Sequence, residues 1–187
     1  RSNENMLSRI AKYRREDGDI SRATFIQVSG NDFGSNVFFH LHVWNIISEW
    51  DKIDYIVLAG WMHIIPEIFI KNCEKKGMRI INLHPTLQYQ LIGRDVYPKI
   101  WKMYQDGMIR ETGCMVHYVA RQIDRGELIQ ESKLDLSTVK TYEEYHLAMY
   151  GNENDVPGLE KKCLFDALHK LLTTEWNKKP GGSEEHT

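Results

Sequence analysis

The sequence predicts an α/β fold with a mostly parallel sheet and helices on both faces. Short β-rich runs alternate along the chain with longer segments of helical pattern, as in proteins built from βα units. One expected strand, 79–83, presents Asn82 and His84 two residues apart before Pro85 stops it. Open α/β sheets bind ligands at the carboxyl ends of their strands, so this strand end is the first candidate for a functional site.

The expected strands are runs of β-branched, aromatic and other apolar residues between turn residues. They cover 24–28, 55–59, 79–83, 113–119 and 128–134. Within 113–119 the side chains alternate, with even positions facing one way and odd positions the other. The run 128–134 is another strand candidate, so 114–134 resembles a hairpin or a paired segment.

The expected helices are recognised by apolar spacing and by start and stop residues. They cover 6–15, 37–50, 65–76, 98–105, a segment after Thr141, and 159–172. Thr141 and Glu144 have the spacing of a capping box. Pro66 lies in the first turn of the 65–76 segment, and Gly77 follows its last residue. The apolar stripe of the 159–172 segment extends to Leu172.

Composition limits the classes of protein to consider. At 187 residues and 42% hydrophobic, we expect one domain over 1–176 and a disordered polar tail over 177–187. The net charge of −2 gives no basis for a nucleic-acid partner or a charged membrane surface, and no apolar run approaches the ~20 residues of a membrane helix. Cys73, Cys114 and Cys163 are widely spaced, so we expect reduced thiols in a cytoplasmic protein.

Three polar residues could carry chemistry. Asn82 supplies a neutral hydrogen-bond donor and His84 a proton near neutral pH. Asp124 lies in a Gly-containing turn between two apolar segments, and a carboxylate beside a His raises its pKa and orients it. Each also has an ordinary structural explanation, as a surface turn or a satisfied pair at a strand end, and sequence spacing leaves open whether the three meet.

Other polar features give weaker signals. His40 and His42 are two residues apart on a helix and do not share a face, so we expect no metal site there. We interpret His117 as a packed or hydrogen-bonded strand residue. The 29–36 loop follows a strand and precedes a helix, so its amides could hold a phosphate, although it matches no complete phosphate-loop motif.

Four motifs in order resemble one family. They are Tyr55-Ile-Val-Leu-Ala-Gly-Trp-Met-His-Ile-Ile65, Ile81-Asn-Leu-His-Pro-Thr86, Gly113-Cys-Met-Val-His-Tyr-Val119 and Ile123-Asp-Arg-Gly126. The region 20–172 resembles the folate-dependent formyltransferases, and within them the eukaryotic monofunctional phosphoribosylglycinamide formyltransferases. The resemblance implies a Rossmann-like formyltransferase fold.

The resemblance also implies roles for particular residues. His84 is similar to the family's general acid/base, Asn82 to the donor to the formyl oxygen, and Asp124 to the carboxylate that assists the His. The residues similar to the two folate-binding loops are Met62, His63, Ile64, Ile65, Ala120, Arg121, Gln122, Ile123 and Asp124, together with Asn82. The segment similar to the one near the ribonucleotide consists of Pro157, Gly158, Leu159 and Glu160.

The reaction implied by the resemblance is formyl transfer from 10-formyltetrahydrofolate to the amino group of glycinamide ribonucleotide, in purine biosynthesis. Asn82 and protonated His84 would stabilise the oxyanion that forms. The implied partners are small molecules, without metal, nucleic acid or membrane, and the implied state is a monomer or homodimer.

The sequence departs from the family at its start. Fewer residues precede Leu58 than in the family. In one alignment 24–28 is the family's third strand, and the preceding strands and phosphate loop are missing. In the other, 29–36 is a distorted phosphate loop. We favour the first.

Other departures affect the site. The stretch 94–97 replaces a histidine-containing stretch, His63 stands where bacterial relatives carry Arg, and 151–158 looks like an insertion. Three alternatives to the leading hypothesis stay open: a formyltetrahydrofolate deformylase that uses water as acceptor, a sugar N-formyltransferase, and a non-catalytic truncated domain of this fold.

Overall fold

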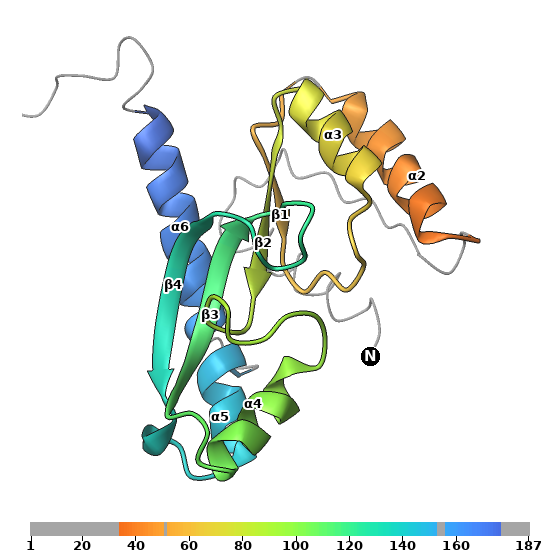
Figure 1. The fold of residues 1–187 in the computed structure, drawn as a ribbon. Helices are drawn as coiled ribbons and strands as arrows, with labels where there is room; N and C mark the ends of the chain where they lie inside the picture. The colour runs from red at the N-terminus through yellow and green to blue at the C-terminus, as the bar shows by residue number, and fades with distance from the viewer. Residues whose placement is uncertain (1–33, 51, 153–155, 177–187) are drawn as a thin grey trace, which may run out of the picture. The chain divides into compact units, whose positions relative to one another are not determined.

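The computed structural model describes residues 34–50, 52–152 and 156–176. The helix expected at 6–15, the strand expected at 24–28, the loop residues 29–33 and the tail 177–187 lie outside the described residues. The elements are α2 (Asn36–Ser48), β1 (Tyr55–Leu58), α3 (Glu67–Lys75), β2 (Arg79–His84), α4 (Val96–Gln105), β3 (Glu111–Tyr118), β4 (Leu128–Asp135), the 3₁₀ helix η2 (Leu136–Thr138), α5 (Tyr142–Tyr150) and α6 (Leu159–Trp176) (Figure 1). The expectation of one domain over 1–176 stays a prediction.

The helix starts follow local chemistry. In α2, the Ser35 hydroxyl accepts a hydrogen bond from the Phe38 amide at 3.3 Å, as an N-cap does. In α5, the Thr141 hydroxyl accepts from the Glu144 amide at 3.1 Å. The Glu144 carboxylate accepts in return from the Lys140 amide, one residue before the position that the capping-box pattern predicts.

The four described strands form a mixed sheet in the order β1-β2-β3-β4. β1 and β2 are parallel, whereas β2 pairs with β3 and β3 with β4 in antiparallel fashion. The α/β class and the β3–β4 hairpin are confirmed. The sheet is mixed rather than mostly parallel in its described part, because residues 119–127 are too few for the crossover that a parallel β3–β4 pair would need.

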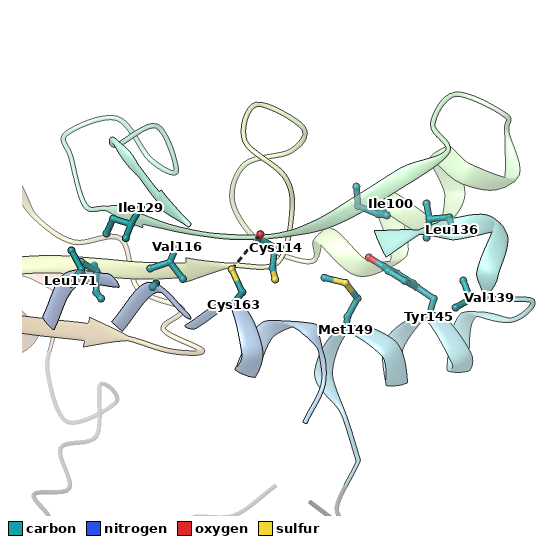
Figure 2. Packing of buried hydrophobic residues seen from close by; sticks show 12 residues of the cluster. Ile100, Cys114, Val116, Ile129, Leu136, Val139, Tyr145, Met149, Cys163 and Leu171 are labelled. Atoms are coloured by element: carbon teal, nitrogen blue, oxygen red, sulfur yellow. Dashed lines mark hydrogen bonds between the residues drawn. The ribbon is translucent and has the colours of Figure 1, made fainter. Parts of the chain in front are cut away.

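Helices cover both faces of the sheet, as predicted. Alternation along β2 sends Ile80 to one face and Ile81 to the other. Ile81 belongs to a core under α5 and α6, whereas Ile80 packs with buried α3 residues such as Phe69 and Ile70. We call the first cluster the α6 core; its buried members are Ile81, Ile100, Cys114, Val116, Ile129, Leu136, Val139, Tyr145, Met149, Cys163, Ala167 and Leu171. Figure 2 shows Cys163 of α6 directed at the strand residue Cys114.

Two helix expectations need correction in detail. In α6 the buried stripe is Cys163, Ala167 and Leu171, spaced four residues apart, while Leu172 is 61% exposed, because one further residue rotates it by about 100° around the helix. The helix expected at 37–50 is rich in aromatic and aliphatic residues, yet only Phe39 and His40 of α2 are buried. No helix in the described ranges is both long and apolar enough to cross a membrane.

Candidate active site

The site begins at the end of β2, where Asn82 and His84 lie on the same face of the strand. His84 is buried, and its Nδ1 lies 3.5 Å from Oδ2 of Asp124. The Asn82 amide nitrogen lies 3.5 Å from the other carboxylate oxygen of Asp124. The structure therefore brings together the three residues that the sequence singled out, although Asp124 is some forty residues away in the chain.

Asp124 is held in place by the backbone around it. Its φ angle of 53° lies in the left-handed region, which Asp tolerates better than most residues. Its Oδ2 accepts a hydrogen bond from the Gly93 amide at 2.8 Å. Gly126, two residues later, packs so closely that a Cβ would lie 1.6 Å from the Tyr118 carbonyl oxygen. This turn can therefore form only where residue 126 has no side chain.

His117 is a fourth member of the site, and the sequence reasoning missed it. It is buried, and its Nε2 lies 3.6 Å from Asp124 Oδ1 and 3.4 Å from the Asn82 amide nitrogen. Its Nδ1 donates to the Tyr118 carbonyl at 2.8 Å. The signal is the β2–β3 register, which pairs Asn82 directly with His117. We call Asn82, His84, His117 and Asp124 the Asp124 site.

The electrostatics of the site favour a neutral His84 beside a charged Asp124. Burial lowers the pKa of His84; the charge of Asp124 and the bond to Leu91 oppose this shift, and His117 adds to it. Burial alone would raise the pKa of Asp124, but the interaction with His117, the hydrogen bond from the Gly93 amide and the electrostatic influence of the two histidines outweigh it, so the pKa lies below its ordinary value.

One nitrogen of His84 is available for proton exchange. Its Nε2 lies 3.0 Å from the Leu91 carbonyl, and a carbonyl can only accept, so Nε2 carries a hydrogen. Thr86 donates to the same carbonyl at 3.0 Å. The Nδ1 facing Asp124 is therefore the atom that gains or loses a proton. This assignment follows from hydrogen-bond geometry.

The two segments expected to bind folate expose apolar side chains. Met62 and Ile64 are more than half exposed, and Ile123 is also exposed. The Ile64 carbonyl accepts from the Asn36 side chain at 2.7 Å, which attaches the first segment to α2. In the second segment, Arg121 pairs with Glu67 of α3 at 2.7 Å.

The segment expected near the ribonucleotide attaches to α4. Pro157 forms an isolated β-bridge with Gly151. The Glu160 carboxylate accepts a hydrogen bond from the Tyr97 hydroxyl, and burial raises the pKa of Glu160 to about 7. Tyr97 lies in the first turn of α4, four residues after Gly93, which binds Asp124. The structure thus links Glu160 to the Asp124 site through the start of α4.

His40 was one of the two histidines weighed as metal ligands. His40 lies in an aromatic cluster with Phe39 and Trp61, and its Nδ1 donates to the Asn36 carbonyl at 2.7 Å. Burial lowers its pKa. Among the described residues, no group of three or more His, Cys, Asp or Glu side chains is placed to hold a metal ion.

Comparison with known proteins identifies the family. The model of the formyl transferase family matches residues 34–157. The chain belongs to the formyl transferase family. The match spans α2 through α5 and includes all four residues of the Asp124 site.

Individual relatives agree with this assignment. The chain is 32% identical over 139 residues to phosphoribosylglycinamide formyltransferase of Dictyostelium discoideum, an alignment that covers 73% of this chain and 64% of that protein. The enzyme of the same name from Schizosaccharomyces pombe is 32% identical over 119 residues, covering 63% and 54%. The chain thus spans a little over half to just under two thirds of these relatives.

Solved structures agree on the fold. Phosphoribosylglycinamide formyltransferase from Bacillus halodurans superposes with a TM-score of 0.66 at 22% identity, covering 80% of this chain and 70% of that one. The structure from Campylobacter jejuni also gives 0.66, at 21% identity. The expected Rossmann-like formyltransferase fold is confirmed. The expectation that the first strands of that fold are missing concerns residues outside the described ranges, so it stays a prediction.

Proposed function

We propose that this protein transfers a formyl group from 10-formyltetrahydrofolate to the amino group of glycinamide ribonucleotide, in purine biosynthesis in the cytoplasm. The single observation that carries the proposal is the contact of His84 Nδ1 with Asp124 at 3.5 Å, with the Asn82 amide against the same carboxylate. The choice of glycinamide ribonucleotide as the formyl acceptor follows from the names of the relatives. The protein would act on small molecules as a monomer or homodimer.

Each residue of the site has a proposed part in the transfer. The Asn82 amide would donate to the oxygen that becomes negative during transfer, which is worth on the order of 3 kcal/mol. Neutral His84 would take the proton of the attacking amine at Nδ1 and return it to the leaving nitrogen. Asp124 would stabilise the charged imidazole between these two events, and such proton transfer contributes ~100-fold or more.

This assignment refines the role expected for His84. The resemblance implied that a protonated His84 stabilises the oxyanion, whereas burial lowers its pKa in the structure. A neutral ring must first accept a proton, so His84 acts as a base before it acts as an acid. His117 would keep the Asp124 carboxylate oriented from the opposite side to His84, through its contact with Oδ1.

The residues present fit a folate. The donor supplies the formyl group. Exposed Met62, Ile64 and Ile123 offer apolar surface for a flat ring system beside buried polar groups, the usual composition of a ligand site. We propose that 62–65 and 120–124 bind the folate. We propose that Pro157, Gly158, Leu159 and Glu160 approach the ribonucleotide.

The test is formyl transfer by the purified full chain. Incubated with 10-formyltetrahydrofolate and glycinamide ribonucleotide, the protein should produce formylated ribonucleotide and tetrahydrofolate in equal amounts, measured by mass spectrometry. Asp106→Asn, which changes an exposed carboxylate paired with Lys102 on the surface, serves as the matched control and should leave the rate unchanged. Release of formate at the same rate without the ribonucleotide would contradict the proposal and indicate a deformylase. Absence of turnover with either acceptor would also contradict it.

A further inference from the structure

A stacked pair of side chains joins the turn that carries Asp124 to a loop on the other side of the site. The Arg125 guanidinium lies over the ring of Tyr89, 4.8 Å from the ring centre. Arg125 directly follows Asp124, whereas Tyr89 lies in the connection between β2 and α4. Tyr89 is 67% exposed, so this pair lies at the surface, outside the buried Asp124 site.

The connection between β2 and α4 orients both members of the proton-transfer pair. The Leu91 carbonyl accepts from His84 Nε2 at 3.0 Å, and the Gly93 amide donates to Asp124 Oδ2 at 2.8 Å. The first contact fixes which nitrogen of His84 carries a hydrogen, and the second orients the carboxylate that faces the other nitrogen. We call residues 87–93 the site loop. Any shift of the site loop relative to the turn would disturb this geometry.

The site loop is anchored to the β3–β4 hairpin on both sides of Tyr89. The Gln88 amide donates to the Glu131 carboxylate at 2.9 Å, and the Thr112 hydroxyl donates to the Gln90 side-chain oxygen at 2.9 Å. Tyr89 itself has a φ angle of 67°, which a bulky residue adopts only where the surrounding structure holds it. Strain of this kind gathers at functional sites, and here the strained residue is the one whose ring contacts Arg125.

Arg125 is related to Asp124 through the backbone rather than through its charge. The Arg125 amide donates to the Gln122 carbonyl at 3.3 Å, which closes the turn around Asp124. Burial raises the pKa of Asp124, and the two histidines of the site and Gly93 lower it; among the described groups, the Arg125 charge is not one of these causes. The guanidinium over the Tyr89 ring can therefore hold the turn in place without changing the charge balance of the site.

We propose that Arg125 and Tyr89 are positioning residues, whose stack holds the turn against the site loop and so keeps the Asp124 carboxylate in contact with His84. This inference rests on the proposed function for its effect on turnover. Since an exposed cation–π contact is weak, its loss should lower kcat by about 2- to 5-fold. KM should change much less, because the stack acts on proton transfer and touches no proposed ligand.

The kinetic test compares variants that remove or keep the stack in the full chain. Tyr89→Leu and Arg125→Gln should each lower kcat of formyl transfer by about 2- to 5-fold. The double variant should be no slower than either single variant, because both remove the same contact. Tyr89→Phe keeps the ring and should retain the wild-type kcat. Phe165→Leu, which removes an exposed ring that stacks on His169 of α6, is the matched control and should leave kcat and KM unchanged.

Two further measurements show whether the stack acts through Asp124. In the Asp124→Asn background, Tyr89→Leu should lower kcat no further, since the charge that it positions is already lost. Amide hydrogen exchange of Gly93, followed by NMR without substrate, should be about 2- to 5-fold faster in Tyr89→Leu than in the wild-type protein. Tyr89→Phe should exchange at the wild-type rate.

The outcomes separate this inference from the proposed function. With transfer intact in the wild-type protein, the inference alone is overturned by additive losses in the double variant, by a Tyr89→Phe variant as slow as Tyr89→Leu, or by unchanged exchange of Gly93 in Tyr89→Leu. A rise in KM at constant kcat would overturn it as well, by assigning the pair to ligand binding. Absence of transfer in the wild-type protein would overturn the proposed function and this inference with it.

Discussion

The α6 core and the Asp124 site are both buried, but they are held together by different physics. In the α6 core, side chains such as Cys163 and Ala167 are fully buried and contribute through apolar area and close packing. In the Asp124 site, titratable groups are buried against one another, and each oxygen or nitrogen needs a partner. Replacing a core residue therefore affects stability, whereas replacing a site residue affects charge and proton position.

The largest effect should follow the loss of the Asp124 charge. Asp124→Asn keeps the shape of the side chain but cannot stabilise a charged His84. We expect kcat to fall by about 100- to 10,000-fold, measured as formyl transfer under saturating donor. Asp106→Asn is the control. If Asp124→Asn kept a kcat within about 3-fold of wild type, a change that is small beside the expected range, Asp124 would be removed from the mechanism.

The next largest effect should come from Asn82. Asn82→Ala removes the amide that lies beside the carboxylate and His117, and kcat should fall by about 100- to 1,000-fold, as for loss of one oxyanion donor. Since the amide would bind the transition state more strongly than the ground state, KM should change much less than kcat. A rise in KM with constant kcat would instead assign Asn82 to substrate binding.

Gly126 tests the backbone that supports the site. Gly126→Ala would place a Cβ 1.6 Å from the Tyr118 carbonyl oxygen, so the turn must move; we expect a loss of about 1–3 kcal/mol in the free energy of unfolding together with reduced transfer. Gly34→Ala, where a Cβ meets nothing within 4 Å, is the control. Unchanged denaturation midpoints for both variants would contradict the close packing of this turn.

The smallest effect on activity is expected in the α6 core. Cys163→Ala removes a buried sulfur that contacts the Cys114 carbonyl at 3.6 Å, and it should lower the free energy of unfolding by about 1 kcal/mol with kcat unchanged. Urea denaturation and the transfer assay measure the two quantities separately. A loss of kcat comparable to that of Asp124→Asn would show that the two regions are not independent.

The core was more predictable from the sequence than the site. Alternation in 113–119 places Cys114 and Val116 in the α6 core, since strand periodicity depends only on local sequence. The Asn-x-His pattern at a strand end located Asn82 and His84 in the same way. Asp124 could be suspected from its turn, but its approach to His84 depends on how the chain returns to the sheet.

The sequence could not supply the register between paired strands or the exclusion of solvent from the Asp124 site. His117 was interpreted as a packed or hydrogen-bonded strand residue, and its place in the site was missed because that place depends on pairing opposite Asn82. Pairing between distant strands is a tertiary property. The lowered pKa of His84 depends on burial. The ion pair of Arg121 with Glu67 likewise required the spatial proximity of a loop and the start of α3, which are distant in the chain.

The most direct test is the pKa of His84, measured by NMR titration of its ring carbon in the wild-type protein and in Asp124→Asn. Burial should place the wild-type pKa below the ordinary 6.5. Because the Asp124 charge favours the protonated ring, its removal should lower the pKa further, and the acid limb of kcat/KM should move to lower pH with it. A pKa that stays the same or rises in Asp124→Asn would contradict the convergence of these two side chains.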